Sequence, residues 1–232
     1  MFSLALEDKQ LLIMLQSATL QFLEQLSKNN NKTWFDGQKA AYVAVKADFE
    51  ALVTDVLAGL AVTDPVFKDQ MAKDSIMRIF RDVRFSKDKT PYKQNLGAGF
   101  SSGGKKIAGA GYYLHIEPGG KSFAGGGMWQ PEGPQLKAIR QEIDYNFKEF
   151  SDIVNDKKFK KLFKEIDGDR LVKVPQGYSE DNPAIDFLRL KSFTVGCPIP
   201  DADLTKKGLA KKVNDAFATM KPFVDFLNRA AV

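Results

Sequence analysis

The sequence predicts an α+β fold, with a central antiparallel sheet formed by the middle of the chain and packed by N-terminal and C-terminal helices. Apolar residues recur at helical spacing over about 1–70 and again after 131, whereas the stretch 75–130 is rich in glycine and loses that period. No linker or low-complexity segment separates these parts. We therefore expect a single domain over 1–232, helical over 1–70, sheet-rich over 75–130, and helical with one or two short strands over 131–232.

The N-terminal part is expected to form two main helices on either side of a polar, Asn-rich break at residues 27–32. Leu20 and Leu23 belong to the apolar stripe of the first helix. The second helix is expected to begin at Thr33 or Asp36, since either can cap it. It is expected to end near Gly59.

The middle of the chain is expected to supply the strands: residues 76–85 are rich in strand-forming residues, and further strands are expected over 95–101, 111–117 and 121–129. Pro118 and Gly119 occupy the positions that a type II turn favours, so the last two of these strands should form a hairpin. The remaining elements are expected to be a helix that starts at Pro131–Pro134, a helix over 159–166 ended by Gly168, a strand over 188–195, and a helix over 204–227 kinked at Pro222.

Cysteine and histidine counts exclude several kinds of site. Cys197 is the only cysteine and His115 the only histidine among 232 residues, so an intramolecular disulfide, a Cys-based zinc site and a multi-His site are impossible. We expect no metal and no cofactor. Gly120-Lys121-Ser122 is not a phosphate-binding loop, because the motif lacks its earlier glycine and no helix follows.

The N-terminus predicts a cytoplasmic protein that does not enter a membrane. Glu7 and Asp8 precede a short apolar run over 11–15, and no basic segment comes before them, as an export signal requires. That run is too short to span a bilayer.

The stretch 77–93 stands apart because basic and apolar side chains alternate along it. As a strand it would place Arg78 and Arg84 on one face and Arg81 on the other, and a helix would not gather every charge either. At least one arginine should therefore lie beside apolar neighbours, where it must be paired. Candidate partners are Asp82, Asp88 and Glu117.

Two interpretations of this stretch stay open. In the first, spare guanidinium donors bind an anion, because the guanidinium fork matches two oxygens of a phosphate or carboxylate. In the second, the charges form an ion-pair network that only fixes the corner of the fold. The candidate ligand-binding residues are Arg78, Arg81, Arg84, Lys89 and Tyr92, with Asp82 and Asp88 as structural partners.

The motif Arg78-x-x-Arg81-Asp82-x-Arg84-Phe85, followed by Asp88-Lys89-x-x-Tyr92, resembles the signature of a bacterial family of conserved hypothetical proteins, a domain of unknown function. The resemblance covers essentially the whole chain, and the sequence does not depart from the motif. Because no reaction is assigned to this family, the resemblance implies no activity. It continues through Trp34-Phe35, Gly111 to Pro118, Gly125 to Trp129 and Leu136 to Tyr145.

His115 and Glu117 are the candidate catalytic residues, because strand periodicity places them with Tyr113 on one face of the hairpin. Beside the arginines they would form a polar patch with an acid–base pair. The alternative is that His115 lies on a sheet face with its hydrogen bonds made by neighbouring groups and has no catalytic role. Similarly, Gly125–Gly127 permits close approach either of a ligand or of a packed helix or ring.

The leading hypothesis is a site for an anionic or phosphate-bearing small molecule, with catalysis left open. The rival is a non-enzymatic module that binds nucleic acid or a protein, with a purely structural arginine motif. It rests on lysine clusters over 157–164 and 206–212, which are otherwise solvated helix faces. The net charge of +5 permits a polyanionic partner without requiring one.

Overall fold

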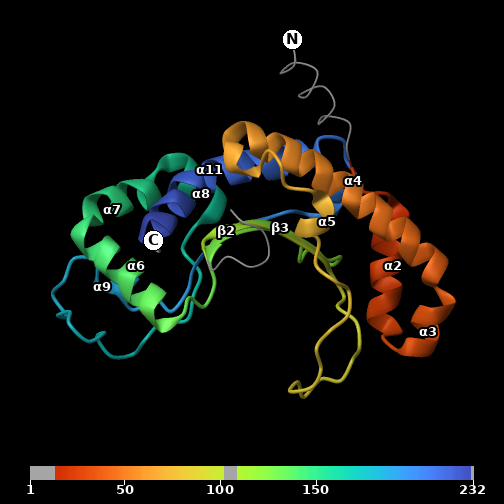
Figure 1. The fold of residues 1–232 in the computed structure, drawn as a ribbon, viewed down its shortest axis with the longest axis horizontal. Helices are drawn as coiled ribbons and strands as arrows, with labels where there is room; N and C mark the ends of the chain where they lie inside the picture. The colour runs from red at the N-terminus through yellow and green to blue at the C-terminus, as the bar shows by residue number, and fades with distance from the viewer. Residues whose placement is uncertain (1–13, 102–108, 231–232) are drawn as a thin grey trace, which may run out of the picture. The chain divides into compact units, whose positions relative to one another are not determined.

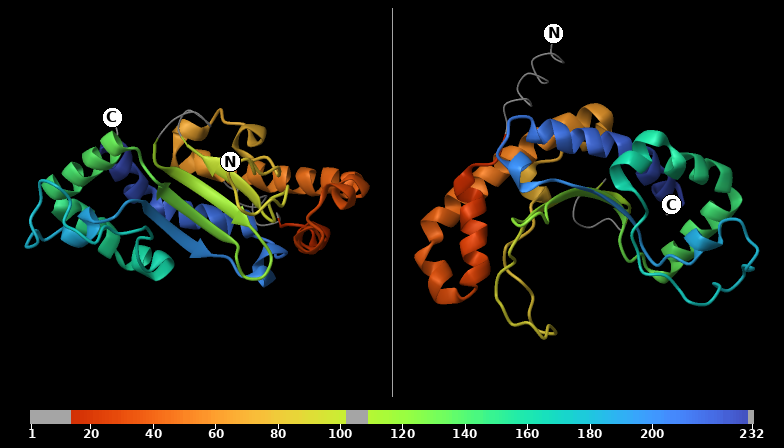
Figure 2. Two further views of the ribbon diagram at one scale, coloured as in Figure 1. Left: turned by 90° about the horizontal axis from the view of Figure 1, so that it is seen from below. Right: turned by 180° about the vertical axis from the view of Figure 1, so that it is seen from behind.

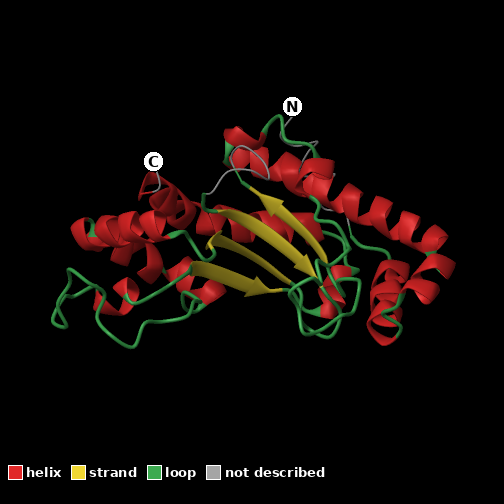
Figure 3. Ribbon diagram, turned by 60° about the horizontal axis from the view of Figure 1, so that its bottom comes forward, coloured by secondary structure: helices red, strands yellow, loops and turns green. Residues whose placement is uncertain are grey.

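The computed structural model describes residues 14–101 and 109–230, and it confirms the α+β class. A four-stranded antiparallel sheet in the order β1-β2-β3-β4 is packed by N-terminal helices and by a long C-terminal helix (Figures 1 and 3). The elements are α2 Ser17–Lys28, α3 Lys32–Gly37, α4 Lys39–Thr63, the 3-10 turn η1 Pro65–Phe67, α5 Ala72–Ser75, β1 Leu96–Phe100, β2 Gly111–Ile116, β3 Phe123–Met128, α6 Gly133–Tyr145, α7 Phe147–Asn155, α8 Lys157–Phe163, α9 Ile185–Leu188, β4 Phe193–Pro198, α10 Asp201–Leu204 and α11 Leu209–Ala230.

The described residues fall into two compact units. Among the described residues, the first unit comprises 14–100, 113–124 and 198–215. The second comprises 101, 109–112, 125–197 and 216–230.

In the first unit, α2 packs along α4 (Figure 2). Asn31 starts α3 by accepting a hydrogen bond from the backbone N–H of Trp34. The buried face of α4 includes Phe49, Leu52 and Val53. Burial of such side chains contributes roughly 1.5–3 kcal/mol each, so this face stabilises the helix pair.

Residues 76–95 form an extended two-stranded projection that we call the arginine arm, drawn in yellow in Figure 1. Antiparallel bridges join Ile76 to Ala98 and Phe80 to Tyr92, and the backbone N–H of Arg81 donates to the carbonyl oxygen of Pro91 at 2.9 Å. The arm thus extends the ladder of β1 and turns back over residues 82–90.

Strand β2 shows the predicted alternation. Tyr112, Leu114 and Ile116 are buried, whereas Tyr113 and His115 on the opposite face are only partly covered.

The turn after β2 has the predicted form, with Gly119 at φ 90°. The backbone N–H groups of Gly119 and Gly120 both donate to the carboxylate of Asp201, at 2.7 and 3.0 Å. The first residue of α10 therefore holds the tip of the hairpin.

In the second unit, α11 packs on the sheet, where Phe217 contacts the ring of Tyr112 with centroids 5.0 Å apart. The glycines of β3 permit close packing. A Cβ on Gly126 would lie 2.5 Å from the sulfur of Met220, and one on Gly127 would lie 2.0 Å from the carbonyl oxygen of Phe193. Of the two interpretations of these glycines, packing against protein atoms accounts for both positions.

Several predicted boundaries are wrong. Helix α4 runs on through Gly59 to Thr63, because glycine at an interior position weakens a helix without ending it. Asn31, rather than Thr33 or Asp36, is the side-chain cap of α3.

The last expected strand begins later than predicted, since Ile185–Leu188 is helical and β4 starts at Phe193. Helix α8 ends at Phe163, before Gly168, and the expected helix over 204–227 is divided between α10 and α11.

The segment containing Glu7 and Asp8, on which the prediction about export rests, lies outside the described residues. Among those that are described, no helix combines the length and apolar composition needed to cross a bilayer.

Candidate functional site

Arg81 is the arginine of the arm that is most enclosed, with a quarter (25%) of its side chain exposed. Its guanidinium forms an ion pair with Asp88 and donates to the carbonyl oxygen of Thr90 at 3.1 Å and to the Thr90 hydroxyl. Asp88 in turn accepts from the backbone N–H of Thr90 at 2.9 Å. The bonds from Arg81 to Asp88 and Thr90 all leave from its Nη1 atom, and together they close the turn of the arm.

Arg84 and Lys89 are also engaged locally. Arg84 forms a two-pronged pair with Asp82, its Nε and Nη2 donating at 2.9 and 2.6 Å, although 76% of its side chain is exposed. The Arg84 hydrogen bonds hold the pKa of Asp82 below its usual range. The Nζ of Lys89 donates to the carbonyl oxygen of Val83 at 3.0 Å.

Tyr92 is a core residue at the base of the arm. Its ring stacks on Phe35 with centroids 4.0 Å apart and planes at 14°, and Phe80 packs against it at 5.5 Å. The side chain of Asn30 bonds both backbone groups of Tyr92, at 2.9 and 3.1 Å. The ring therefore attaches the arm to α3.

Arg78 and Lys93 differ from the other cations of the arm. Among the residues that the structure describes, neither has a carboxylate oxygen within 4.0 Å of its charged nitrogens. The two side chains repel each other, and burial, reinforced by the charge of Arg78, lowers the pKa of Lys93. The half-buried Lys93 and the exposed Arg78 thus gather positive charge where the arm meets β1, although the charge of Arg78 also helps to lower the pKa of Asp82.

His115 lies in a hydrogen-bonded row on the partly covered face of β2. Its Nε2 is 3.0 Å from Oε2 of Glu117, while its Nδ1 is 3.3 Å from both the Tyr113 hydroxyl and the Asn95 amide nitrogen. The imidazole also stacks on Phe123, with centroids 5.0 Å apart. Only 17% of the His115 side chain and 19% of the Glu117 side chain are exposed.

These contacts define the protonation pattern of the row. The Asn95 amide nitrogen can only donate, so it fits an imidazole whose Nδ1 accepts and whose Nε2–H donates to Glu117. Burial alone would raise the pKa of Glu117, but hydrogen bonds from Lys121 and His115 outweigh it and lower that pKa. Burial raises the pKa of Tyr113, which therefore stays a hydroxyl donor at neutral pH.

The structure brings some of the predicted site residues together and leaves others apart. His115 and Glu117 form a direct pair, and the Tyr113 hydroxyl closely approaches the backbone of Gly97 on β1. Arg81 and Arg84 turn toward Asp88 and Asp82, so the arginines do not converge on one point. In the described ranges, no group of three or more acidic, Cys or His residues could hold a metal ion.

In the comparison with protein families, the chain matches the model of a conserved hypothetical protein family, DUF2461, over residues 18–226. The chain belongs to the DUF2461 family. This confirms the resemblance to a domain of unknown function. No curated protein and no solved structure matches the chain.

The DUF2461 match includes both the arginine arm and the His115 strand. The sequence did not identify Lys93 or Asn95 as candidate site residues. Lys93 ends the basic stretch, and its partial burial follows only from the fold. Asn95 reaches His115 because β1 and β2 are neighbours in the sheet, which the spacing of residues in one strand does not reveal.

Proposed function

We propose that this protein binds an anionic or phosphate-bearing small molecule where the arginine arm meets β1 and β2. The observation that carries the proposal is the neighbouring pair Arg78 and Lys93, with no carboxylate partner among the described residues. Lys93 is half-buried whereas Arg78 is exposed. Because a partly buried cation is normally paired, the counter-charge that Lys93 lacks is most simply supplied by a ligand, and Arg78 beside it adds attraction for an anion. Asn95 is two residues from Lys93, at most about 7 Å along the chain, and connects this charge to His115.

In this proposal the row on β2 supplies hydrogen bonds and a route for a proton. Tyr113 can present its hydroxyl to the ligand, and His115 can accept the phenolic proton while Glu117 stabilises the resulting imidazolium. His115 and Glu117 are therefore proposed as the acid–base pair if the bound molecule reacts. The other candidates from the sequence are then assigned a structural role, that of holding the arm in shape: Arg81, Arg84, Lys89 and Tyr92. Of the five anion-binding candidates, only Arg78 is kept in this proposal.

The test is to titrate the protein with inorganic phosphate and with a panel of phosphomonoesters at constant ionic strength. The melting temperature of the protein is measured at each concentration. We expect a saturable rise for the native protein that Arg78→Met and Lys93→Met each abolish. Lys87→Met is the matched control, because Lys87 is an exposed cation of the same arm. If no anion stabilises the native protein more than the Lys93→Met variant, the proposal fails.

A second candidate function has one observation in its favour. Helix α8 carries four exposed lysines, none of which forms an ion pair with a described residue: Lys157, Lys158, Lys160 and Lys161. Such a face can bind a nucleic-acid backbone, with affinity that falls steeply as salt rises. A gel-shift titration at two salt concentrations tests it, and the absence of a shift at low salt excludes it.

A further inference from the structure

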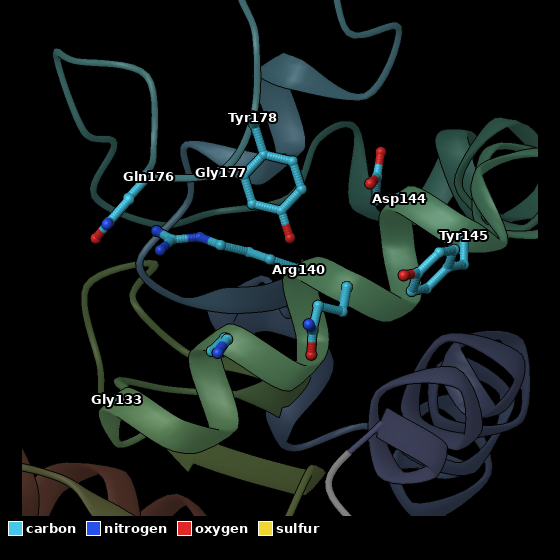
Figure 4. Close-up of a pocket in the computed structure, with 9 residues that line it drawn as sticks. Gly133, Arg140, Asp144, Tyr145, Gln176, Gly177 and Tyr178 are labelled. Carbon is cyan, nitrogen blue, oxygen red and sulfur yellow. The ribbon is translucent and has the colours of Figure 1, made fainter.

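The second unit contains a cavity of about 560 Å³ between α6 and the loop around Gly177, shown in Figure 4. One wall is the polar face of α6, whose residues recur at helical spacing, and the loop supplies Gln176, Gly177 and Tyr178. The α6 residues of the wall are Lys137, Arg140, Gln141, Asp144 and Tyr145.

Arg140 is the central side chain of this cavity and runs from α6 toward Gln176 and past the ring of Tyr178 (Figure 4). One Nη2–H of its guanidinium donates to the carbonyl oxygen of Leu190 at 3.1 Å. Its Nε is buried and has no hydrogen-bond partner in the described part of the chain. Most of the five donors of this guanidinium are therefore unused.

The charge of Arg140 is also uncompensated. No carboxylate oxygen of the residues that the structure describes lies within 4.0 Å of it, and burial lowers its pKa. The one acid of the cavity wall, Asp144, already accepts a hydrogen bond from the side-chain amide of Asn182 at 2.7 Å. Lys137 adds a second positive charge, so the wall carries two cations against one engaged carboxylate.

We propose that this cavity binds a small molecule through its carboxylate or phosphate group, with Arg140 as the anchor. An oxyanion there would supply the missing counter-charge and accept from the free guanidinium donors. The Tyr178 hydroxyl and the Gln176 amide line the same cavity and can bond the polar remainder of the ligand. The cavity volume lies within the range of small-molecule sites. This site shares no residue with the one on the arginine arm.

The experiment follows the Arg140 Nε–H signal in a nitrogen-15 correlation spectrum, assigned by its loss in Arg140→Lys. Inorganic phosphate and sodium acetate are titrated separately, with sodium chloride balancing the ionic strength. We expect a saturable shift of this signal and a matching rise in melting temperature. A response to phosphate alone identifies a phosphate site, and a response to acetate alone identifies a carboxylate site.

Two variants separate anchoring from general charge effects. Arg140→Met should abolish the stabilisation by the anion. Arg170→Met should retain it, because Arg170 is an exposed arginine of the same unit that also donates to a backbone carbonyl, that of Asp186. Lys93→Met should have no effect on the Arg140 signal, so failure of the arm site leaves this test unaffected.

If Arg140→Met does not fold, Lys137→Met replaces it as the test variant, because Lys137 is exposed and its substitution should not disturb folding. It should weaken anion binding by about fivefold, as expected for the loss of an exposed ion pair worth up to about 1 kcal/mol. An Arg140 signal that does not respond to either anion, or that responds equally to chloride, would overturn the proposal. So would a folded Arg140→Met protein that is stabilised as strongly as the native one.

Discussion

The Nε2 atom of His115 lies 3.0 Å from a carboxylate oxygen of Glu117, which follows the last residue of β2. The pair is four-fifths covered and continues through Lys121 on one side and Tyr113 on the other. Strand β2 fixes the backbone of His115, and Glu117, the first residue after the strand, is held by a hydrogen bond from its backbone N–H to the Ser122 hydroxyl at 2.9 Å.

The first prediction concerns the pH dependence of stability that Glu117 creates. Its folded-state pKa lies below the ordinary value of 4.5, so its stabilising effect is complete above about pH 4.5 and is lost as the pH falls through the folded pKa. Glu117→Gln should therefore reduce the free energy of unfolding at pH 7 by about 1–3 kcal/mol. The difference from the native protein should shrink toward pH 3. Urea denaturation at both pH values measures it, and a difference that grows on acidification would contradict the assigned bonds.

The second prediction compares two arginines of the arm. Arg81→Ala should reduce the free energy of unfolding by about 1.5–3 kcal/mol, since it removes charged hydrogen bonds from a half-buried turn. Arg84→Ala should change the free energy of unfolding much less than Arg81→Ala does, because the pair of Arg84 with Asp82 is exposed to solvent. Chemical denaturation of both variants makes the comparison. Equal losses would show that the turn does not depend on Arg81.

The third prediction concerns Tyr92, whose ring stacks on Phe35. Tyr92→Ala should cost about 3–5 kcal/mol, as for other buried aromatic residues. Tyr92→Phe keeps the stack and should change stability little. If Tyr92→Phe instead removed the response to phosphate while leaving stability intact, the hydroxyl would belong to the binding site.

The fourth prediction concerns the glycines. Gly127→Ala should cost at least about 3 kcal/mol, because a Cβ there meets the backbone oxygen of Phe193 at 2.0 Å and φ is 117°. Gly37→Ala is the control, since no atom lies within 4 Å of its Cβ position. It should be neutral or stabilise by up to about 1 kcal/mol. Thermal unfolding of both variants tests the contrast.

The sequence predicts best what depends on local periodicity. Alternation along β2 is sufficient to place His115 and Glu117 on one face, and the Pro-Gly turn marks the end of that strand. The fold class follows from the change of period in the middle of the chain, and the structure confirms it.

Contacts between residues that are far apart in the sequence could not be predicted from local periodicity. The partner of Arg81 is decided by how the tip of the arm turns, which brings Asp88 beside it rather than Glu117. The contact of Asn95 with His115 requires the order of strands. The cavity at Arg140 requires the loop around Tyr178, whose sequence has no regular period.

The bonds from Gly119 and Gly120 to Asp201 have a consequence for how the protein is made. During synthesis the hairpin emerges from the ribosome some eighty residues before the carboxylate that fastens its tip. Until that acidic side chain arrives, the two amides can bond only to water. We therefore expect nascent chains that stop short of residue 201 to carry a frayed hairpin end, which full-length chains do not.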